Sequence, residues 1–140
     1  MNASRFLDTS ILLYAYDLDA PGKRAVAQRL VEQGWISPGE TAISVQVLQE
    51  MHVNLEKRGV PRAEAGQIIR DYAQWPVVDN TRDLLLSALR EQVRWGISLW
   101  DALILAAARA AGASELISED FNSGQDYDGV RVLNPFQRET

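Results

Sequence analysis

The sequence predicts an α/β fold with a mostly parallel sheet, and two observations support that prediction. Short apolar runs alternate along the chain with longer segments whose apolar residues recur at helical spacing. This alternation is typical of parallel sheets, because a helix provides the crossover between two parallel strands. No internal repeat, low-complexity segment or linker interrupts the pattern. We therefore expect a single domain over residues 1–140.

The first half of the chain is predicted to contain two strands and four helices. Arg5 begins a short apolar strand that ends at Asp8. Gly34 is expected to stop an amphipathic helix, and Ser44 can cap the helix that follows the second strand. The predicted strands are residues 5–7 and 41–43, and the predicted helices are residues 10–16, 23–33, 45–57 and 62–73.

The second half is predicted to contain three strands and two helices. Pro76 places the first of these strands near an edge of the sheet. One helix is apolar on nearly all sides between a cap at Ser98 and a stop at Gly112, which predicts a buried helix. The other helix, residues 82–95, has an apolar stripe that includes Leu85, Leu86, Leu89 and Val93. The predicted strands are residues 75–78, 116–117 and 130–133.

The composition is that of a globular protein and excludes several kinds of site. The chain is 46% hydrophobic and 24% charged, and no apolar run approaches the roughly 20 residues of a membrane-spanning helix. Residues 1–10 lack the basic start and long apolar core of a secretory signal. There is no Cys, which excludes disulfides and thiolate ligands and fits a cytoplasmic location. Because His52 is the single histidine, any metal would be bound by oxygen atoms, as Mg²⁺ and Mn²⁺ are.

The formal net charge of −5 argues against binding of nucleic acid by general attraction to its phosphates. Proteins that bind in that way are usually basic. An acidic cleft that holds divalent cations is a different case, because bound cations reverse the local sign of the charge. The charge therefore leaves open a metal-dependent enzyme that acts on nucleic acid.

Four acidic residues are predicted to gather at one edge of the sheet. Asp8 and Asp120 follow strand ends, and Asp101 lies in the first turn of a helix, so all three are expected at the carboxyl edge of a parallel sheet. Glu50 borders the buried stripe of a helix that can pack on the same edge. Three of the acids also have a plainer interpretation: Asp8 and Asp101 as capping carboxylates, and Glu50 as an exposed surface residue.

Four carboxylates in one cleft would repel one another and shift each other's pKa values, which favours the binding of one or two divalent cations. Such ions orient a water molecule, lower its pKa and neutralise charge on a phosphate. The chemistry that this arrangement indicates is metal-assisted hydrolysis of a phosphodiester.

Four segments of the chain resemble, in order, the four motifs of the PIN-domain ribonucleases. They are Phe-Leu-Asp-Thr-Ser at residues 6–10, Ser-Val-Gln-Val-Leu-Gln-Glu at 44–50, Ser-Leu-Trp-Asp-Ala-Leu-Ile at 98–104 and Leu-Ile-Ser-Glu-Asp-Phe-Asn-Ser-Gly-Gln at 116–125. The ending Gly-Val-Arg-Val-Leu-Asn-Pro-Phe, at residues 129–136, resembles that of the VapC-type toxins in the same group. The resemblance covers nearly the whole chain.

This resemblance implies a three-layer α/β/α PIN-like fold whose mostly parallel central sheet has four to five short strands. It makes Asp8, Glu50, Asp101 and Asp120 the catalytic, metal-binding acids, with Thr9, Ser10 and Ser118 in supporting positions. Glu119 is the neighbour of Asp120, but Asp120 occupies the position of the motif.

The resemblance also implies an activity. The protein would be a magnesium-dependent endoribonuclease, with Mn²⁺ as an alternative ion, and the toxin of a type II toxin–antitoxin system. Its substrate would be RNA, cut by a metal-activated water. It would be a homodimer, inhibited by a cognate antitoxin, and would meet DNA only indirectly through that antitoxin. No binding to a membrane is expected.

Two other functions remain as alternatives. An enzyme that transfers phosphate to Asp8 usually has a second acid two residues on and a downstream lysine. Position 10 is Ser, and the only lysines are Lys23 and Lys57. A non-catalytic binding or regulatory module of the same fold would use its acids only as caps and surface charges.

Overall fold

Five short parallel strands form the centre of the computed structural model, which describes residues 1–137. Residues 138–140 of the predicted domain lie outside the described part. The strands run side by side in the order β3-β2-β1-β4-β5, and each neighbouring pair is parallel. They are β1 (Arg5–Leu7), β2 (Thr41–Ser44), β3 (Val77–Val78), β4 (Glu115–Ile117) and β5 (Arg131–Leu133). The expected α/β class and parallel sheet are confirmed, and β3 is an edge strand as Pro76 indicated.

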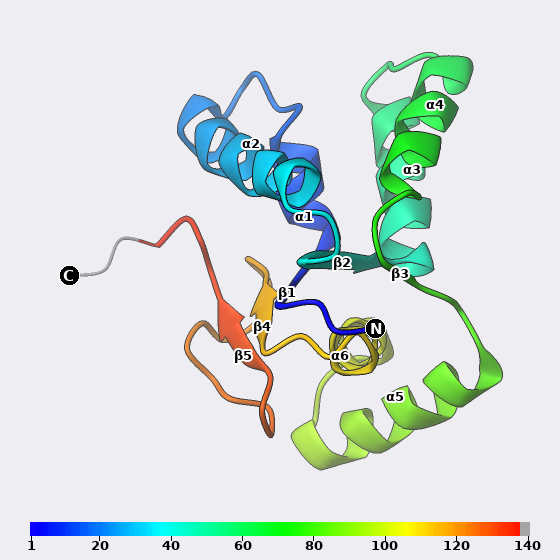
Figure 1. Ribbon diagram of the computed structural model, residues 1–140, viewed down its shortest axis with the longest axis vertical. Helices are drawn as coiled ribbons and strands as arrows, with labels where there is room; N and C mark the ends of the chain where they lie inside the picture. Colours follow the sequence, from blue (N-terminus) through cyan, green and yellow to red (C-terminus); the bar gives the residue numbers. More distant parts are fainter. Residues whose placement is uncertain (138–140) are drawn as a thin grey trace.

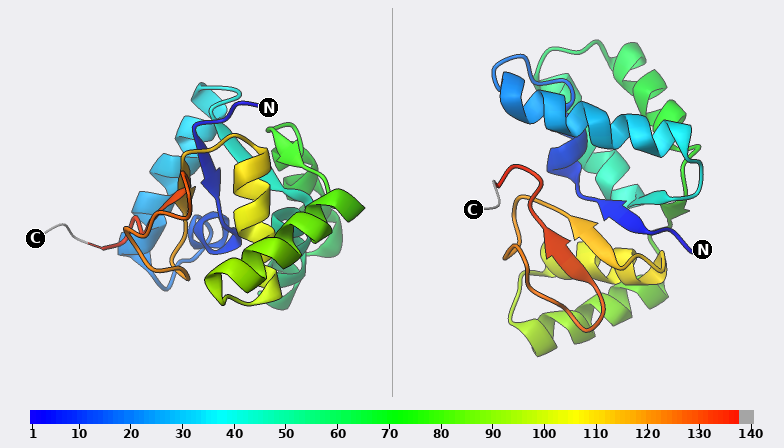
Figure 2. Two further views of the ribbon diagram at one scale, coloured as in Figure 1. Left: turned by 90° about the horizontal axis from the view of Figure 1, so that it is seen from below. Right: turned by 60° about the vertical axis from the view of Figure 1, so that its left-hand side comes forward.

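Helices cover both faces of the sheet and produce the three layers (Figure 1). Figure 2 shows the same arrangement from two further directions. On one side lie α1 (Thr9–Tyr14), α2 (Pro21–Ile36), α3 (Val45–Lys57) and α4 (Arg62–Tyr72). On the other side lie α5 (Arg82–Trp95) and α6 (Leu99–Ala110). Among residues 1–137, no helix has the length and apolar character needed to cross a membrane.

A row of buried side chains crosses the sheet and anchors its centre. Phe6 of β1 is in register with Ala42 of β2 and with Leu116 of β4, and Leu116 is in register with Val132 of β5. All four residues are completely buried. Strands that are covered on both faces are expected to bury apolar side chains, and these four positions do so.

The carboxyl edge of the sheet is where the predicted site residues begin. The backbone N–H of Asp8 donates to the carbonyl of Ile117 over 3.0 Å, so the ends of β1 and β4 are joined there. At the end of β2, Ser44 caps α3 by accepting a hydrogen bond from the N–H of Val47 over 3.3 Å. Three segments that are distant in sequence therefore enter the site from neighbouring strands.

The prediction that Gly34 ends the second helix is wrong, because α2 continues through it to Ile36. A Cβ atom at position 34 would lie 2.5 Å from the ring of Trp75. Trp75 is buried, with 6% of its surface exposed. This glycine is required for the close approach of the indole to the helix, a tertiary contact that local pattern does not reveal.

The apolar stripe of α5 is exposed in the structure. Its four members are 42–87% exposed, and Leu84 and Ala88 are buried in their place. The helix contains apolar residues over more than one face, and packing against α6 selects the face of Leu84 and Ala88. The exposed residues Leu85, Leu86, Leu89 and Val93 are called the α5 apolar face below.

Candidate functional site

Asp8 is buried at the junction of β1 and α1, with both carboxylate oxygens hydrogen-bonded. It is the N-cap of α1, and its Oδ1 accepts a 2.7 Å hydrogen bond from the N–H of Thr9. Its Oδ2 accepts a 2.8 Å hydrogen bond from the hydroxyl of Ser118. Burial raises the pKa of Asp8 to about 6, against the effect of these hydrogen bonds and with further increases from Asp120 and Glu50. The capping interpretation of Asp8 is therefore correct but incomplete.

Glu50 is half-buried on α3 and faces α1. Its Oε2 accepts a 2.6 Å hydrogen bond from the hydroxyl of Thr9, and its Oε1 accepts one of 3.0 Å from the amide of Gln46. Gln46 lies one helical turn before Glu50, so the two side chains share a face of α3. The structure thus brings Asp8, Thr9 and Glu50 together, and Thr9 is the link between the two acids.

Ser118 connects Asp8 to the segment that carries Asp120. Its hydroxyl donates to Asp8 and accepts a 3.1 Å hydrogen bond from the N–H of Asp120. Ser118 is fully buried, whereas Asp120 lies at the solvent-exposed rim. Partial burial, followed by the charges of Glu119 and Glu50, raises the pKa of Asp120. A single serine side chain therefore links the Asp8 carboxylate to the backbone of Asp120.

Asp101 enters from the opposite layer, in the first turn of α6. Ser98 is the N-cap, and its hydroxyl accepts a 3.1 Å hydrogen bond from the N–H of Asp101. The pKa of Asp101 is raised, first by burial and then by the charges of Asp120 and Glu50. Burial raises the pKa of the Tyr127 hydroxyl, and the charge of the nearby Asp101 raises it further.

Ser10, which was predicted to support the site, and Glu119, the neighbour of Asp120, have contacts away from the four acids. Ser10 does not contact the Asp8 carboxylate, and among residues 1–137 its buried hydroxyl has no hydrogen-bond partner. Glu119 pairs with Lys23 over 2.6 Å and with the hydroxyl of Tyr14 over 2.8 Å. The single histidine, His52, lies 3.0 Å from Glu56.

The chemistry of the four acids fits a hard divalent cation, because all of their donor atoms are carboxylate oxygens. Burial is the main reason that the pKa values of Asp8, Asp101 and Asp120 are raised, and the charges of neighbouring acids raise them further, so the carboxylates lie within range of mutual repulsion. Within the described residues, however, no three acidic or histidine side chains converge as a closed metal cluster. A bound divalent cation would relieve this repulsion and allow the carboxylates to approach one another more closely.

Sequence reasoning missed three residues that bind acidic side chains: Gln46 binds Glu50, and Lys23 and Tyr14 bind Glu119 beside Asp120. Gln46 carried a usable signal, since it stands four residues before Glu50 on one helix. Lys23 and Tyr14 carried none, because their partner Glu119 is 96 and 105 residues away along the chain.

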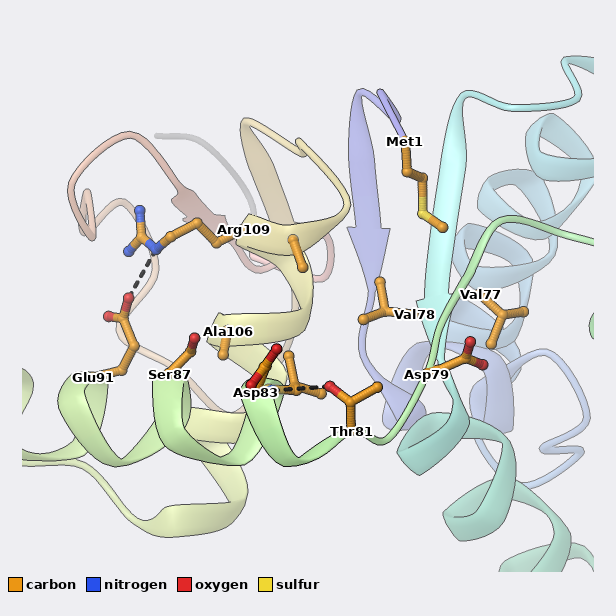
Figure 3. Close-up of a pocket in the computed structure, with 12 residues that line it drawn as sticks. Met1, Val77, Val78, Asp79, Thr81, Asp83, Ser87, Glu91, Ala106 and Arg109 are labelled. Carbon is orange, nitrogen blue, oxygen red and sulfur yellow. Dashed lines mark hydrogen bonds and ion pairs between the residues drawn. The ribbon is translucent and has the colours of Figure 1, made fainter.

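A pocket of about 520 Å³ lies away from the four acids. Figure 3 shows its walls, formed by β3, α5 and α6, with Arg109 turned toward Glu91. Asp79 and Asp83 also line it, but none of the four predicted acids does. Its volume therefore gives no support to the candidate site, which rests on the hydrogen bonds and charges described above.

Comparison with known proteins identifies the family. Residues 5–124 match the model of the PIN domain. Ribonuclease VapC24 of Mycobacterium tuberculosis (strain CDC 1551 / Oshkosh) is 28% identical over 141 residues, which cover 92% of this chain and 94% of the relative.

Solved structures show the same relationship. VapC20 of Mycobacterium tuberculosis, described as a sarcin–ricin loop cleaving toxin, is 30% identical in sequence to this chain and superimposes with a TM-score of 0.64. The match covers 84% of this chain and 92% of the VapC20 chain. A toxin–antitoxin complex from Klebsiella pneumoniae has a TM-score of 0.66 at 23% identity, over 94% of this chain and 98% of that one, a likeness of fold. From the extent of the family match and these relatives, we conclude that the chain belongs to the PIN-domain family and is of the VapC type.

Proposed function

We propose that this protein is an endoribonuclease that depends on a divalent metal, Mg²⁺ with Mn²⁺ as an alternative. Asp8, Glu50, Asp101 and Asp120 are the proposed metal-binding and catalytic acids. The observation that carries the proposal is the buried carboxylate of Asp8, hydrogen-bonded at both oxygens and raised in pKa by burial and by two other acids. Burying such a carboxylate lowers the stability of the folded state, and groups of this kind are typical of functional sites.

The residues of the chain have separable tasks in this proposal. The backbone of Thr9 and the hydroxyl of Ser118 fix the orientation of the Asp8 carboxylate. The hydroxyl of Thr9 and the amide of Gln46 fix Glu50. A bound divalent ion would supply a Lewis acid and a water of lowered pKa for attack on a phosphodiester.

The relatives support RNA as the substrate. VapC24 is named a ribonuclease, and VapC20 is described as a toxin that cleaves the sarcin–ricin loop. We extend only the substrate class to this chain. Bound cations would also compensate for the net charge of −5, which by itself disfavours contact with RNA.

The proposal includes a biological setting. The protein would be the toxin of a type II toxin–antitoxin system, act in the cytoplasm, and be inhibited by a cognate antitoxin. The structural relative from Klebsiella pneumoniae is part of a toxin–antitoxin complex, which is an assembly of this kind. The α5 apolar face supports a homodimer, because contiguous exposed apolar residues favour a protein–protein contact.

The test is cleavage of a cellular RNA pool by the purified protein, with and without Mg²⁺ or Mn²⁺. Asp8→Asn preserves the size of the side chain and removes its charge. We expect it to lower the cleavage rate by at least about 100-fold, as does loss of other preorganised electrostatic groups. It should also abolish growth arrest on expression.

Asp79→Asn is the matched control, because Asp79 is exposed and lies in the separate pocket. It should behave as the wild type does. If the wild type cuts no RNA with either ion, and Asp8→Asn arrests growth as the wild type does, the nuclease proposal is wrong and a non-catalytic role is favoured.

A further inference from the structure

Glu119 is bound in a cluster of four side chains from four segments of the chain, called the Glu119 clamp. Lys23 Nζ at the start of α2 lies 2.6 Å from Glu119 Oε2, and the hydroxyl of Tyr14 donates to Oε1 over 2.8 Å. Lys23 Nζ is also 3.3 Å from the Tyr14 hydroxyl oxygen. Both oxygens of the Glu119 carboxylate are therefore occupied.

Aromatic rings cover the cation of the clamp. Lys23 Nζ lies 4.8 Å from the centroid of the Tyr14 ring and 5.4 Å from that of Phe136. The two rings meet edge to face, with centroids 5.0 Å apart. Phe136 follows β5, so the clamp ties this late segment to α1 and α2. Such cation–aromatic contacts restrict where the ammonium can lie.

The clamp is adjacent to Asp120 along the chain and acts on the same short loop. Ser118 is bound to Asp8, and Glu119 is bound to Lys23 and Tyr14. Two consecutive side chains are thus fixed to different partners. This pair of attachments restricts the backbone of residues 118–120, and the N–H of Asp120 remains hydrogen-bonded to Ser118.

We propose that Glu119 and Lys23 are positioning residues for Asp120, which hold its carboxylate toward the candidate site and keep the neighbouring Glu119 carboxylate out of it. The inference rests on the proposed nuclease function. Neither residue touches the reacting atoms in this proposal. Lys23 has a second effect, because its positive charge offsets the carboxylate of Glu119 beside the four acids.

The exposure of the Lys23–Glu119 pair argues against a purely stabilising role. The side chains of Lys23 and Glu119 are 42% and 26% exposed, and ion pairs that water can reach contribute little to stability. A role in binding RNA would also differ. Removing a lysine that contacts phosphate raises KM, whereas removing a nearby carboxylate lowers it or leaves it unchanged.

The experiment compares Lys23→Met, Lys23→Arg, Glu119→Gln and the double variant Lys23→Met/Glu119→Gln in the full chain. We expect Lys23→Met and Glu119→Gln each to lower kcat by about 10-fold, as loss of a residue that orients a metal ligand does. KM should change little. The double variant should be no worse than either single one, because both break the same contact. Lys23→Arg should recover most of the activity.

The matched control is Arg62→Met, which removes an exposed ion pair with Glu56. It should leave kcat unchanged. A second readout does not require activity: hydrogen exchange of the Asp120 amide should be faster in Lys23→Met, and slow again in Lys23→Arg. Melting temperatures should stay within about 3 °C of the wild type.

The proposal is overturned if Lys23→Met retains both the wild-type kcat and the slow exchange of the Asp120 amide. It is also overturned if Lys23→Met raises KM while Glu119→Gln does not lower kcat, which would assign Lys23 to RNA binding. If the wild type itself cuts no RNA, the nuclease proposal fails. The exchange rate of the Asp120 amide then tests the positioning role by itself, and an unchanged rate in Lys23→Met rejects that role.

Discussion

At the scale of single residues, the sequence indicated the acids but not what holds them. Asp8 and Asp120 were identifiable because each follows an apolar run, and parallel strands bring their carboxyl ends to one edge. The bonds of Glu119 and the lack of a partner for Ser10 among residues 1–137 were not identifiable. Contacts between side chains about 100 residues apart depend on the finished packing, which leaves no periodic trace in the sequence.

Asp8 gives a prediction about stability and pH in metal-free protein. Its pKa is about 6 in the folded chain against an ordinary 3.8, so the folded state binds the proton more tightly than the unfolded state does. Between these pH values stability falls as pH rises, and at pH 7 the ionised side chain costs up to about 3 kcal/mol. In EDTA at pH 7, Asp8→Asn should therefore be more stable than the wild type.

Urea unfolding at several pH values measures this difference. It should shrink as the pH falls and vanish below about pH 4, where Asp8 is protonated in both states. Asp79→Asn serves as the exposed control. An Asp8→Asn protein that is equally stable or less stable at pH 7 would show that burial does not disfavour the charge.

At the scale of elements, local signals were strong where a helix begins and weak where packing decides. The predicted bounds 45–57 and 82–95 agree with α3 and α5, because Ser44 and Thr81 are the caps that such signals describe. The prediction at Gly34 failed because packing, and not a local signal, decides the role of that glycine. A glycine inside a helix has the same local appearance whether it ends the helix or admits a neighbouring ring.

Two glycines in helices should respond oppositely to Ala. Gly34→Ala places a methyl group 2.5 Å from Trp75, so we expect a loss of about 1–3 kcal/mol from overpacking. Gly66→Ala, within α4, meets only Arg70 Nη1 at 3.5 Å and should gain up to about 1 kcal/mol from helix propensity. Chemical denaturation of both variants tests this. A stabilised Gly34→Ala would mean that Trp75 moves aside without cost.

At the scale of the whole molecule, the class of fold was predictable and the order of the strands was not. Alternation of strands and helices indicates a parallel sheet, and burial on both faces explains the apolar strands. The pairing of β1 with both β2 and β4 depends on where each crossover returns, which no local pattern encodes. The exposed face of α5 escaped prediction because apolar residues on two faces compete for one contact with α6.

The α5 apolar face predicts an oligomer that depends on it. We expect light scattering after gel filtration to show a dimer for the wild type and a monomer for Leu89→Glu. Leu89 is 42% exposed in the single chain, so the substitution should leave the fold of each chain intact. Arg90→Glu, an exposed neighbour on the same helix, is the control and should remain dimeric. A dimer that survives Leu89→Glu would place the interface elsewhere.

Because the site forms where the end of β1 meets the end of β4, it can form only after both strands have been synthesised. Asp8 is synthesised 110 residues before Ser118. A nascent chain that has not reached Ser118 lacks the hydroxyl that binds Asp8, as well as one of the proposed acids. A nuclease that needs all four proposed acids would therefore stay inactive beside the ribosome until Ser118 and Asp120 have been synthesised.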